Sequence, residues 1–461
     1  MQKSIFRKGM VLGIILLFVG AGILPSIGGT IIEKHSSIDN KTSFMGFNLR
    51  DPTWYVDDGG GADFTKIQDA INVSSDGDTV FVYSGIYYEH NVSVDKSINL
   101  IGEDKNSTII DGESYNSSVV VIIADWVNIS GFTIRNCGKD YMWSQGHWRY
   151  STLEVKSNYN HVFGNIFNTT NENYNWIGIR IWDSASNTTI DGNIFYGIKT
   201  KGMTGIFTYG DIYTIGECNN NTISNNILYN ADLLVYGNNN IITKNVLTIS
   251  YLVFYVSGCY NTVSYNIVIY STGIYEDGFL FRGLKHSNIY GNFIQGSLVP
   301  EPNQDVPLAA GFWLDKCFNV SIYQNTISRF DYGMRVYDSY NITFHSNDIL
   351  ECTFGIIFEF LENESFYKSL PIGDKPNNLR RNNFRRVLFP ARILFREPKL
   401  CGVNIWEENY WNRPRLIPKI IVGMIKFFEN WGIPAKFQFD IRPANKPYTI
   451  PKVAIKNSYL E

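Results

Sequence analysis

The chain has 461 residues, of which 44% are hydrophobic and 15% are aromatic, so it can form a large core. Its formal net charge is −3 at pH 7. Because no overall positive charge would attract nucleic acid, we expect no nucleic-acid partner.

The N-terminus is basic and then apolar. Lys3, Arg7 and Lys8 precede an apolar run that ends near Leu24. This order is typical of a secretory signal peptide or of an uncleaved membrane anchor. No clear A-x-A cleavage site follows, so both alternatives stay open for residues 1–32. We therefore predict an exported protein, extracellular or at the cell surface, which contacts a membrane only through this segment. No later segment is long and apolar enough to span a bilayer.

Residues 33–52 are polar and unpatterned, and we interpret them as a linker. The next regular pattern is helical, because three apolar residues of the stretch 63–73 share one helical face: Phe64, Ile67 and Ile71. Asp63 and Thr65 are the candidate N-caps of this helix. A helix placed just before a solenoid is expected to cover its open first coil. Short strand patterns follow at 79–83, 85–89, 92–102, 107–112 and 118–136.

One pattern then repeats along the chain, most clearly at 311–327 and 333–349, which are offset by 22 residues. The unit is Gly-apolar-x-apolar, a gap, then Asn-x-x-apolar-x-x-Asn-x-Ile. Its apolar residues alternate, which indicates strands, and a unit this short must stack on copies of itself to bury its apolar side. We therefore predict an all-β fold, a parallel β-helix over residues 53–383.

Asparagines recur at one position of this repeat. We place them at corners, because asparagine tolerates left-handed backbone and can form hydrogen bonds along a ladder. The corner residues are Asn165, Asn193, Asn226, Asn245, Asn266, Asn292, Asn325 and Asn347.

The C-terminal part differs in composition, since ten of the fifteen prolines lie between Pro371 and Pro451. We interpret residues 384–461 as an irregular, proline-rich cap over the last coil. The arginine-rich stretch 380–399 could meet an anionic surface, but a solvated face is the favoured interpretation. Residues 416–433 are apolar, yet Lys419 and other polar residues argue against a membrane span.

Side chains that alternate with the apolar positions of the Gly-apolar-x-apolar strand should point away from the core. They include rings and charged groups, which suit a sugar-binding groove. An ordinary exposed β-face with stacked rings is the alternative. The loop at 138–150 adds aromatic residues that either shape a ligand site or fold back over the helix. The candidate binding residues are Arg180, Trp182, Tyr236, Tyr255, Arg282, Trp313, Arg335 and Tyr337 from the strands, and Trp143 and Trp148 from the loop.

Asp315, Glu359 and Arg335 are the candidate catalytic residues. The two carboxylates occupy one outward column two coils apart, hence about 10 Å at the backbone. Side chains that lean together would approach the ~6.5–9.5 Å carboxyl separation of an inverting glycosidase. A lyase would instead need clustered acids for calcium and an Arg or Lys base, for which Arg282, Asp315 and Arg335 on adjacent coils are candidates.

No cofactor is identified from the sequence. The six histidines form no H-x-H cluster and the six cysteines show no CxxC spacing, so neither copper nor calcium has a recognisable ligand set. We interpret the cysteines as small buried residues of the repeat, although disulfides outside the cell stay an alternative. Twelve N-x-S/T sequons occur, and those in loops, such as Asn116 and Asn168, are the better glycosylation candidates.

The order of these motifs resembles a known class. DFTKIQDAI, DGDTVFV, GIYYE, KSINLIGE, TIIDG and NISGFTI, followed by the asparagine coils, look like the secreted right-handed β-helix proteins of the pectin-lyase-like class. Within it the chain resembles the NosD-like copper-binding and carbohydrate-binding/sugar-hydrolase (CASH) group. The resemblance covers about residues 54–365, and NIWEENYWNRPR (404–415) resembles the C-terminal cap of archaeal members.

This resemblance implies a right-handed helix and a role with polysaccharide or copper. Our leading hypothesis is an exported β-helix that binds or presents to polysaccharide, such as a cell-surface glycan, without catalysis. The alternatives are a polysaccharide lyase or glycoside hydrolase and, third, a copper-handling protein.

Overall fold

The computed structural model describes residues 52–138, 141–142, 147–148, 150–168, 177–182, 185–197, 203–208, 218–249, 254–270, 278–297, 309–361, 376–395, 404–412, 419–428, 431–440 and 442–451. The chain divides into two compact units, residues 1–50 and 51–461. The predicted signal peptide or anchor, and all but the last residue of the predicted linker, lie outside the described residues.

Nearly all regular structure in the second unit is β-strand, and the strands form three parallel ladders. The first ladder contains β4 (Val92–Val94), β7 (Val120–Ile122), β12 (Leu153–Val155), β15 (Ile177–Ile181), β18 (Met203–Thr208), β21 (Ala231–Val235), β24 (Phe254–Val256), β27 (Phe279–Arg282), β30 (Ala310–Asp315), β33 (Tyr332–Tyr337), β36 (Phe354–Phe360), β39 (Phe389–Phe395) and β42 (Lys419–Phe428).

The second ladder contains β1 (Thr53–Val56), β2 (Thr79–Val82), β5 (Asn99–Gly102), β8 (Asn128–Ser130), β13 (His161–Phe163), β16 (Thr189–Asp191), β19 (Thr222–Ser224), β22 (Ile241–Thr243), β25 (Thr262–Ser264), β28 (Asn288–Tyr290), β31 (Ser321–Tyr323), β34 (Thr343–His345), β37 (Asn378–Arg380), β40 (Ile405–Glu407) and β43 (Trp431–Asp440).

The third ladder contains β3 (Gly85–Tyr88), β6 (Thr108–Asp111), β9 (Thr133–Arg135), β14 (Ile166–Asn168), β17 (Ile194–Tyr196), β20 (Ile227–Tyr229), β23 (Val246–Ile249), β26 (Ile267–Tyr270), β29 (Phe293–Gln295), β32 (Thr326–Ser328), β35 (Asp348–Leu350), β38 (Asn383–Arg385) and β41 (Tyr410–Trp411). A separate antiparallel pair joins β10 (Tyr141–Met142) to β11 (His147–Trp148).

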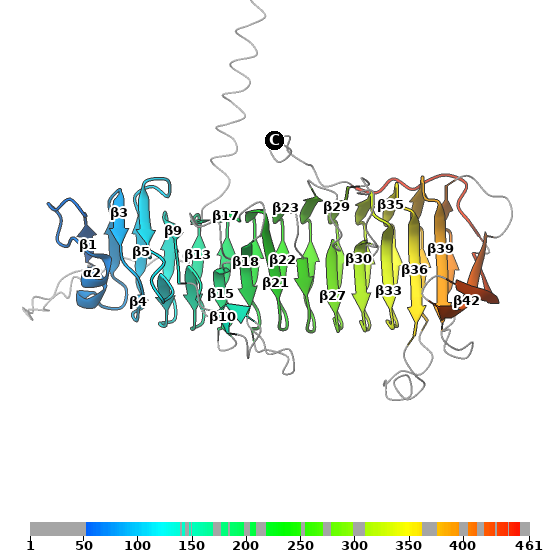
Figure 1. Ribbon diagram of the computed structural model, residues 1–461, viewed down its shortest axis with the longest axis horizontal. Helices are drawn as coiled ribbons and strands as arrows, with labels where there is room; N and C mark the ends of the chain where they lie inside the picture. The colour runs from blue at the N-terminus through cyan, green and yellow to red at the C-terminus, as the bar shows by residue number, and fades with distance from the viewer. Residues whose placement is uncertain are drawn as a thin grey trace, which may run out of the picture. The chain divides into compact units, whose positions relative to one another are not determined.

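Each full coil visits the first, second and third ladder in turn, and each strand pairs with its equivalent in the next coil. For example, β30, β31 and β32 pair in parallel with β33, β34 and β35. Figure 1 shows the strands of successive coils side by side, from blue β1 to orange β39. The coils wind in the right-handed sense that connections between parallel strands almost always take. The predicted parallel β-helix is therefore confirmed.

The core lies between the three ladders and is filled by alternate residues of each strand. In the coil that begins at β30, Leu314, Ile322 and Ile327 each contribute one fully buried side chain. The same positions in neighbouring coils are also apolar and buried, so the core is one continuous cluster. Such stacking explains how short coils bury an apolar side that none could bury alone.

The corner asparagines form a buried hydrogen-bond ladder, as predicted. Asn325 Nδ2 donates to Asn347 Oδ1 at 3.0 Å, and the same bond recurs from Asn165 onward. The left-handed residue is not the ladder asparagine but the one before it, such as Gln324 with φ 57°. Our conformational reason for asparagine was therefore wrong at these positions, and the hydrogen-bonding reason was correct.

The N-terminal end of the helix is covered by α2 (Ile67–Val73), which buries Ile67, Ala70 and Ile71. Neither predicted N-cap operates, because the N-cap position is Lys66 and makes no side-chain cap bond. The Glu89 carboxylate instead accepts hydrogen bonds from the backbone N–H groups of Ile67 (2.7 Å) and Gln68 (3.0 Å). A partner 22 residues away in sequence leaves no local capping signal.

The exposed edges of the first strands are also covered. The Gln68 side chain donates to the Ser93 carbonyl and accepts from the Ser93 N–H, which occupies backbone groups of β4. The segment after β1 folds back so that Phe64 N–H donates to the Tyr55 carbonyl at 3.1 Å. These contacts block pairing with another chain at this end.

The coils continue past residue 383, where we predicted that they end. β38 pairs with β41, and β39 pairs with β42, both in parallel. The predicted irregular cap also contains a regular antiparallel hairpin, β42–β43, which joins the first ladder to the second. Loops with proline interrupt the repeat in this part of the sequence, which hid the last coils.

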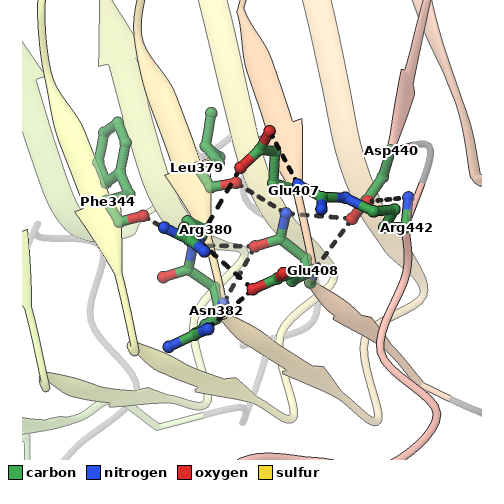
Figure 2. A network of polar contacts seen from close by, with 10 residues as sticks. Phe344, Leu379, Arg380, Asn382, Glu407, Glu408, Asp440 and Arg442 are labelled. Carbon is green, nitrogen blue, oxygen red and sulfur yellow. Dashed lines mark hydrogen bonds and ion pairs between the residues drawn. The ribbon is translucent and has the colours of Figure 1, made fainter.

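The asparagine ladder ends within this hairpin. Asn382 Nδ2 donates to Asn409 Oδ1, and Asn409 Nδ2 donates to Asp440 Oδ2 at 3.2 Å. Asp440 is fully buried and also accepts from Trp411 Nε1 at 2.9 Å. Figure 2 shows Asp440 at the end of this polar network, beside Arg442.

Five of the six cysteines lie among the described residues, and all five are free thiols. Burial raises the pKa of Cys317 and of Cys352 to about 12, so neither is a reactive thiolate. Cys137, Cys218, Cys317 and Cys352 are buried, which confirms the prediction of small buried residues for these four, whereas Cys259 is half-buried. Cys401 lies outside the described residues. Among the residues that the structure describes, no helix has the length and apolar character needed to cross a membrane.

Candidate functional site on the first ladder

The candidate binding residues that were predicted from the strands lie on the first-ladder face, which we define as the side chains of the first ladder that alternate with its core residues. The register confirms this alternation, because Leu314 is fully buried in the core while Trp313 is not. One column of the face runs through Glu154, Arg180, Phe207, Leu234, Tyr255, Leu280, Trp313, Arg335, Ile357 and Arg392. A second column runs through Arg282, Asp315, Tyr337, Glu359 and Leu394.

Phe207 belongs to β18, which the sequence pattern did not resolve. The register of β18 against β21 shifts between Thr204 and Ile206. This irregularity breaks the alternation that identifies a strand from sequence.

The N-terminal part of the face is not an open surface. Glu154 accepts from Ser118 Oγ at 2.5 Å and from Trp182 Nε1 at 3.1 Å, and it pairs with Lys156 at 2.7 Å. The Arg180 guanidinium lies 5.3 Å from the Trp182 ring, and Arg180 is fully buried. Arg180 was predicted as an outward binding residue, but its burial makes it part of the packed structure. This prediction of exposure was wrong. The alternation along a strand shows which side chains point away from the core, but it does not show whether other residues cover them.

The middle of the face holds two tyrosines and an ion pair. Tyr236 and Tyr255 have ring centroids 4.8 Å apart, and burial raises the pKa of both phenols. Arg282 Nε lies 2.9 Å from Asp315 Oδ2, with Arg282 largely exposed and Asp315 buried. These four predicted residues therefore lie close together, with phenol groups beside a neutralised carboxylate.

The C-terminal part of the face is a cluster of rings and guanidinium groups. The Arg335 guanidinium lies 4.8 Å from the Trp313 ring and 5.9 Å from the Tyr332 ring. The Tyr332 and Phe354 rings are 5.1 Å apart, and the Arg392 guanidinium lies 5.8 Å from Phe354. We call this set the Trp313 cluster: Trp313, Tyr332, Arg335, Phe354 and Arg392. All five side chains are half-buried.

Three members of the Trp313 cluster were missed by sequence reasoning. Tyr332 and Phe354 are register partners at the start of their strands, one residue before the repeat glycine. Arg392 lies beyond the predicted end of the helix, in the stretch interpreted as a solvated face. A signal for Tyr332 and Phe354 was present, because both precede the glycine of the repeat.

Two hydrogen-bond donors of the cluster have no acceptor. Within the described part of the chain, Trp313 Nε1 and Arg392 Nε are buried atoms without a hydrogen-bond partner. Buried donors almost always have an acceptor, and leaving one unpaired costs about 1–3 kcal/mol. An acceptor from a bound molecule would satisfy such groups.

The candidate catalytic carboxylates are two coils apart, as the repeat predicted, since Asp315 and Glu359 both have Tyr337 as register partner. Each has a guanidinium partner of its own. Arg335 Nε donates to Glu359 Oε2 at 2.6 Å, and Asp315 pairs with Arg282. The arrangement is thus two charge-neutral pairs on one face, a feature that sequence spacing alone did not reveal.

The remaining predicted residues are less informative. Trp143 lies outside the described residues, and Trp148 belongs to β11, whose backbone pairs with β10. Among the described residues, no group of three His, Cys, Asp or Glu side chains is arranged to hold a metal ion.

Comparisons with known proteins give likeness of fold alone. No protein-family model matches the chain, and no curated protein sequence does. The chain is similar to a mannuronic acid specific polysaccharide family 6 lyase from human gut microbiota, with 13% identity, TM-score 0.38, and coverage of 78% of this chain and 86% of that one.

Two further solved structures are similar at the same level. An alginate lyase, AlyF-OU02, in complex with G6 has 11% identity, TM-score 0.40, and coverage of 80% and 87%. The Dettilon tailspike protein has 13% identity, TM-score 0.41, and coverage of 62% and 64%. These low identities and TM-scores carry no conclusion about activity, and the NosD-like or CASH assignment stays a prediction.

Proposed function

We propose that this chain is an exported β-helix protein that binds polysaccharide through the Trp313 cluster. The observation that carries the proposal is the pair of unsatisfied donors, Trp313 Nε1 and Arg392 Nε, set among adjacent rings on neighbouring coils. A sugar presents C–H groups to aromatic rings and oxygen acceptors to N–H donors. The cluster offers both kinds of contact within a few coils.

The repeat spacing supports an extended ligand. Residues of the first ladder recur about every 4.8 Å along the stack. Trp313 and Arg335 lie one coil apart, and Arg392 lies two coils beyond Arg335, with Ile357 between them. A polysaccharide, which is itself a chain of repeated sugar units, could contact several residues of this row at once.

Binding without catalysis fits the cluster better than bond cleavage. Asp315 and Glu359 are buried and each is paired with an arginine, so neither carboxylate lies free on the face. A general acid or base needs an atom within hydrogen-bond reach of the substrate proton. Lyase or hydrolase activity is therefore the alternative that an activity assay must exclude.

A glycan array probed with the purified protein tests the proposal. Trp313→Ala and Arg392→Ala should each weaken binding of the retained glycan at least about fivefold, because each removes a donor worth ~1 kcal/mol. Tyr88→Ala, which removes an exposed ring far along the chain, is the matched control and should bind as the parent does.

Other outcomes would contradict the proposal. Equal glycan binding by the parent and both variants would show that the Trp313 cluster is not the glycan-binding site. Release of shortened glycan products would make the protein an enzyme. A melting temperature raised by copper, with no glycan retained, would favour the third hypothesis.

A further inference from the structure

Arg392 differs from the other described arginines of the stretch 380–399. The others are each paired with an aspartate or a glutamate: Arg380, Arg381, Arg385 and Arg386. Figure 2 shows one of these pairs, in which Arg380 Nε lies 3.4 Å from Glu408 Oε2. Arg392 has no acidic partner among the described residues, and its guanidinium instead lies 5.8 Å from the Phe354 ring.

The described part of the first-ladder face therefore carries a surplus positive charge beside the Trp313 cluster. Arg282 Nε lies 2.9 Å from Asp315 Oδ2, and Arg335 Nε lies 2.6 Å from Glu359 Oε2. Each of these pairs is neutral as a whole. The charge of Arg392 is not cancelled in this way, although Arg392 belongs to the same column of the face as Arg335.

The burial of Arg392 makes its charge significant. The residue is half-buried, and its Nε is a buried atom without a hydrogen-bond partner. Burial also raises the pKa of Tyr332, and the positive charge of Arg392 is among the influences that oppose this rise, so the charge acts close to the rings of the cluster. Water and salt screen a half-buried charge less than an exposed one, and a negatively charged ligand group would therefore gain more from it.

The chemistry of the face discriminates between anionic ligands. A nucleic acid carries a phosphate on every nucleotide and binds through several cations, whereas Arg392 is a single cation without an acidic partner in the described part of this face. A polysaccharide can carry a charged group on some units and offer C–H groups to the Trp313 ring from others. Trp313 and Arg392 lie three coils apart, which is about 14 Å at 4.8 Å per coil, so they would contact different sugar units.

We propose that the polysaccharide bound by the Trp313 cluster is anionic and that Arg392 is the residue that selects its negative charge. This inference rests on the proposed function, because it names the class of glycan and the contact that distinguishes it. Carboxylate and sulfate groups share the chemistry that Arg392 would recognise, since both offer acceptor oxygens to the guanidinium N–H groups. Arg282 and Arg335 would contribute less to the selection, because protein carboxylates already neutralise them.

Binding of polymers with and without charge tests this selection. The probes are alginate, hyaluronan and dextran sulfate, each beside a neutral counterpart: carboxyl-reduced alginate, carboxyl-reduced hyaluronan and dextran. The parent should bind at least one anionic polymer at least about tenfold more tightly than its counterpart, because hydrogen bonds to an ionised acceptor are stronger than those to a neutral one. The comparison of the carboxylated polymers with dextran sulfate distinguishes the two kinds of charged group.

Two variants separate this inference from the proposed function. Arg392→Gln keeps an N–H donor and removes the charge, so the preference for the anionic polymer should fall to about twofold or less. Trp313→Ala should weaken the binding of the charged and the neutral polymer alike. Arg386→Gln is the matched control and should keep the preference, because it removes an 80% exposed guanidinium that follows β38 of the third ladder.

An unchanged preference in Arg392→Gln, together with weaker binding by Trp313→Ala, would overturn this inference and leave the glycan site in place. A parent that binds anionic and neutral polymers equally, or retains neutral glycans alone, would overturn it in the same way. Binding that Trp313→Ala does not change would contradict the proposed function and this inference with it. Single-stranded DNA that displaces alginate from the parent but not from Arg392→Gln would assign the cation to nucleic acid, which also overturns the inference.

Discussion

A single corner asparagine connects three coils. Asn325 accepts from Asn292 Nδ2 in one neighbouring coil at 2.9 Å and donates to Asn347 Oδ1 in the other at 3.0 Å. It also donates to the Ile289 carbonyl at 3.0 Å. The residue is fully buried, so water cannot replace any of these bonds.

Asn325→Leu should therefore destabilise the protein by about 1–3 kcal/mol, because the buried backbone N–H of Asn292 loses its acceptor, Asn325 Oδ1. Ser321→Ala in the same coil, at an outward strand position, should change stability by less than ~0.5 kcal/mol. Thermal unfolding of the two variants compares them directly. Equal melting temperatures would show that the ladder does not contribute to stability.

The titration of a half-buried histidine gives a pH-dependent prediction. His345 stacks on Tyr323 with ring centroids 4.8 Å apart, and burial lowers the pKa of His345. The folded state therefore binds fewer protons than the unfolded state just below the unfolded pKa of about 6.5. Stability from this group is present above that pH and is lost as the pH falls.

His345→Phe should remove part of the decrease in melting temperature between about pH 7 and pH 5, because phenylalanine keeps the stacked ring and cannot be protonated. Melting curves at several pH values measure this slope. An unchanged slope in the variant would show that other groups, such as His161, cause the decrease.

At the scale of elements, α2 shows why a helix could be predicted better than its start and its cap. The apolar spacing of Ile67 and Ile71 is local, and it predicted a helix that ends at Val73; the helix begins only at Ile67, so the prediction that Phe64 shares its face was wrong, and Phe64 instead forms a β-bridge with Val56. The cap comes from Glu89, which follows β3 and reaches the helix only once the first coil has folded. The ion pairs of Asp315 and Glu359 with arginine were not predicted for a similar reason. The alternation of inward and outward residues assigns side chains to columns, but it does not determine which rotamer each side chain adopts.

Glu89→Ala should lower stability by about 1 kcal/mol, because two backbone N–H groups of α2 lose their acceptor. Burial raises the pKa of Glu89, so a neutral acceptor is tolerated there, and Glu89→Gln should cost less than Glu89→Ala. Thermal unfolding measures both, with Asp69→Ala as an exposed acidic control in the same helix. A larger loss for the glutamine variant would contradict this capping role.

β30 allows a test of side-chain direction within one strand. Leu314→Ala should destabilise by about 2–5 kcal/mol, because it leaves a cavity in the core. Trp313→Ala should alter stability much less and should instead weaken glycan binding. Paired measurements of melting temperature and glycan affinity separate the two effects. A Trp313→Ala variant that fails to fold while Leu314→Ala is stable would contradict the register.

At the scale of the whole second unit, the repeat predicted the fold because each coil has the same register as its neighbours. The prediction ended too early at residue 383, because Pro390, Pro398 and an insertion between β39 and β40 interrupt the repeat in the sequence that follows. β38 pairs with β41 across that insertion. Regular spacing in the sequence therefore predicts coils that follow one another without insertions, and it does not predict coils that are separated by insertions.

The hairpin that ends the stack should also keep the protein monomeric. Removal of residues 413–461 would expose the strand edges of β39 and β40, which are templates for pairing with another chain. We expect the shortened protein to associate as its concentration rises, measured by light scattering after size-exclusion chromatography. A chain shortened only by residues 452–461 keeps the hairpin and should not associate. A monomeric deletion variant would show that these edges are protected in another way.

The asparagine ladder has a direction, because every side-chain amide donates toward the C-terminus and accepts from the N-terminal side. Amide dipoles aligned in this way add, as they do along an α-helix, and leave partial positive charge at the donor end. Asp440 stands at that end with a carboxylate, which can only accept. The asparagine ladder is thus a row of aligned amide dipoles that ends at the Asp440 carboxylate. Asp440 terminates the hydrogen-bond ladder, and its negative charge offsets the partial positive charge at that end.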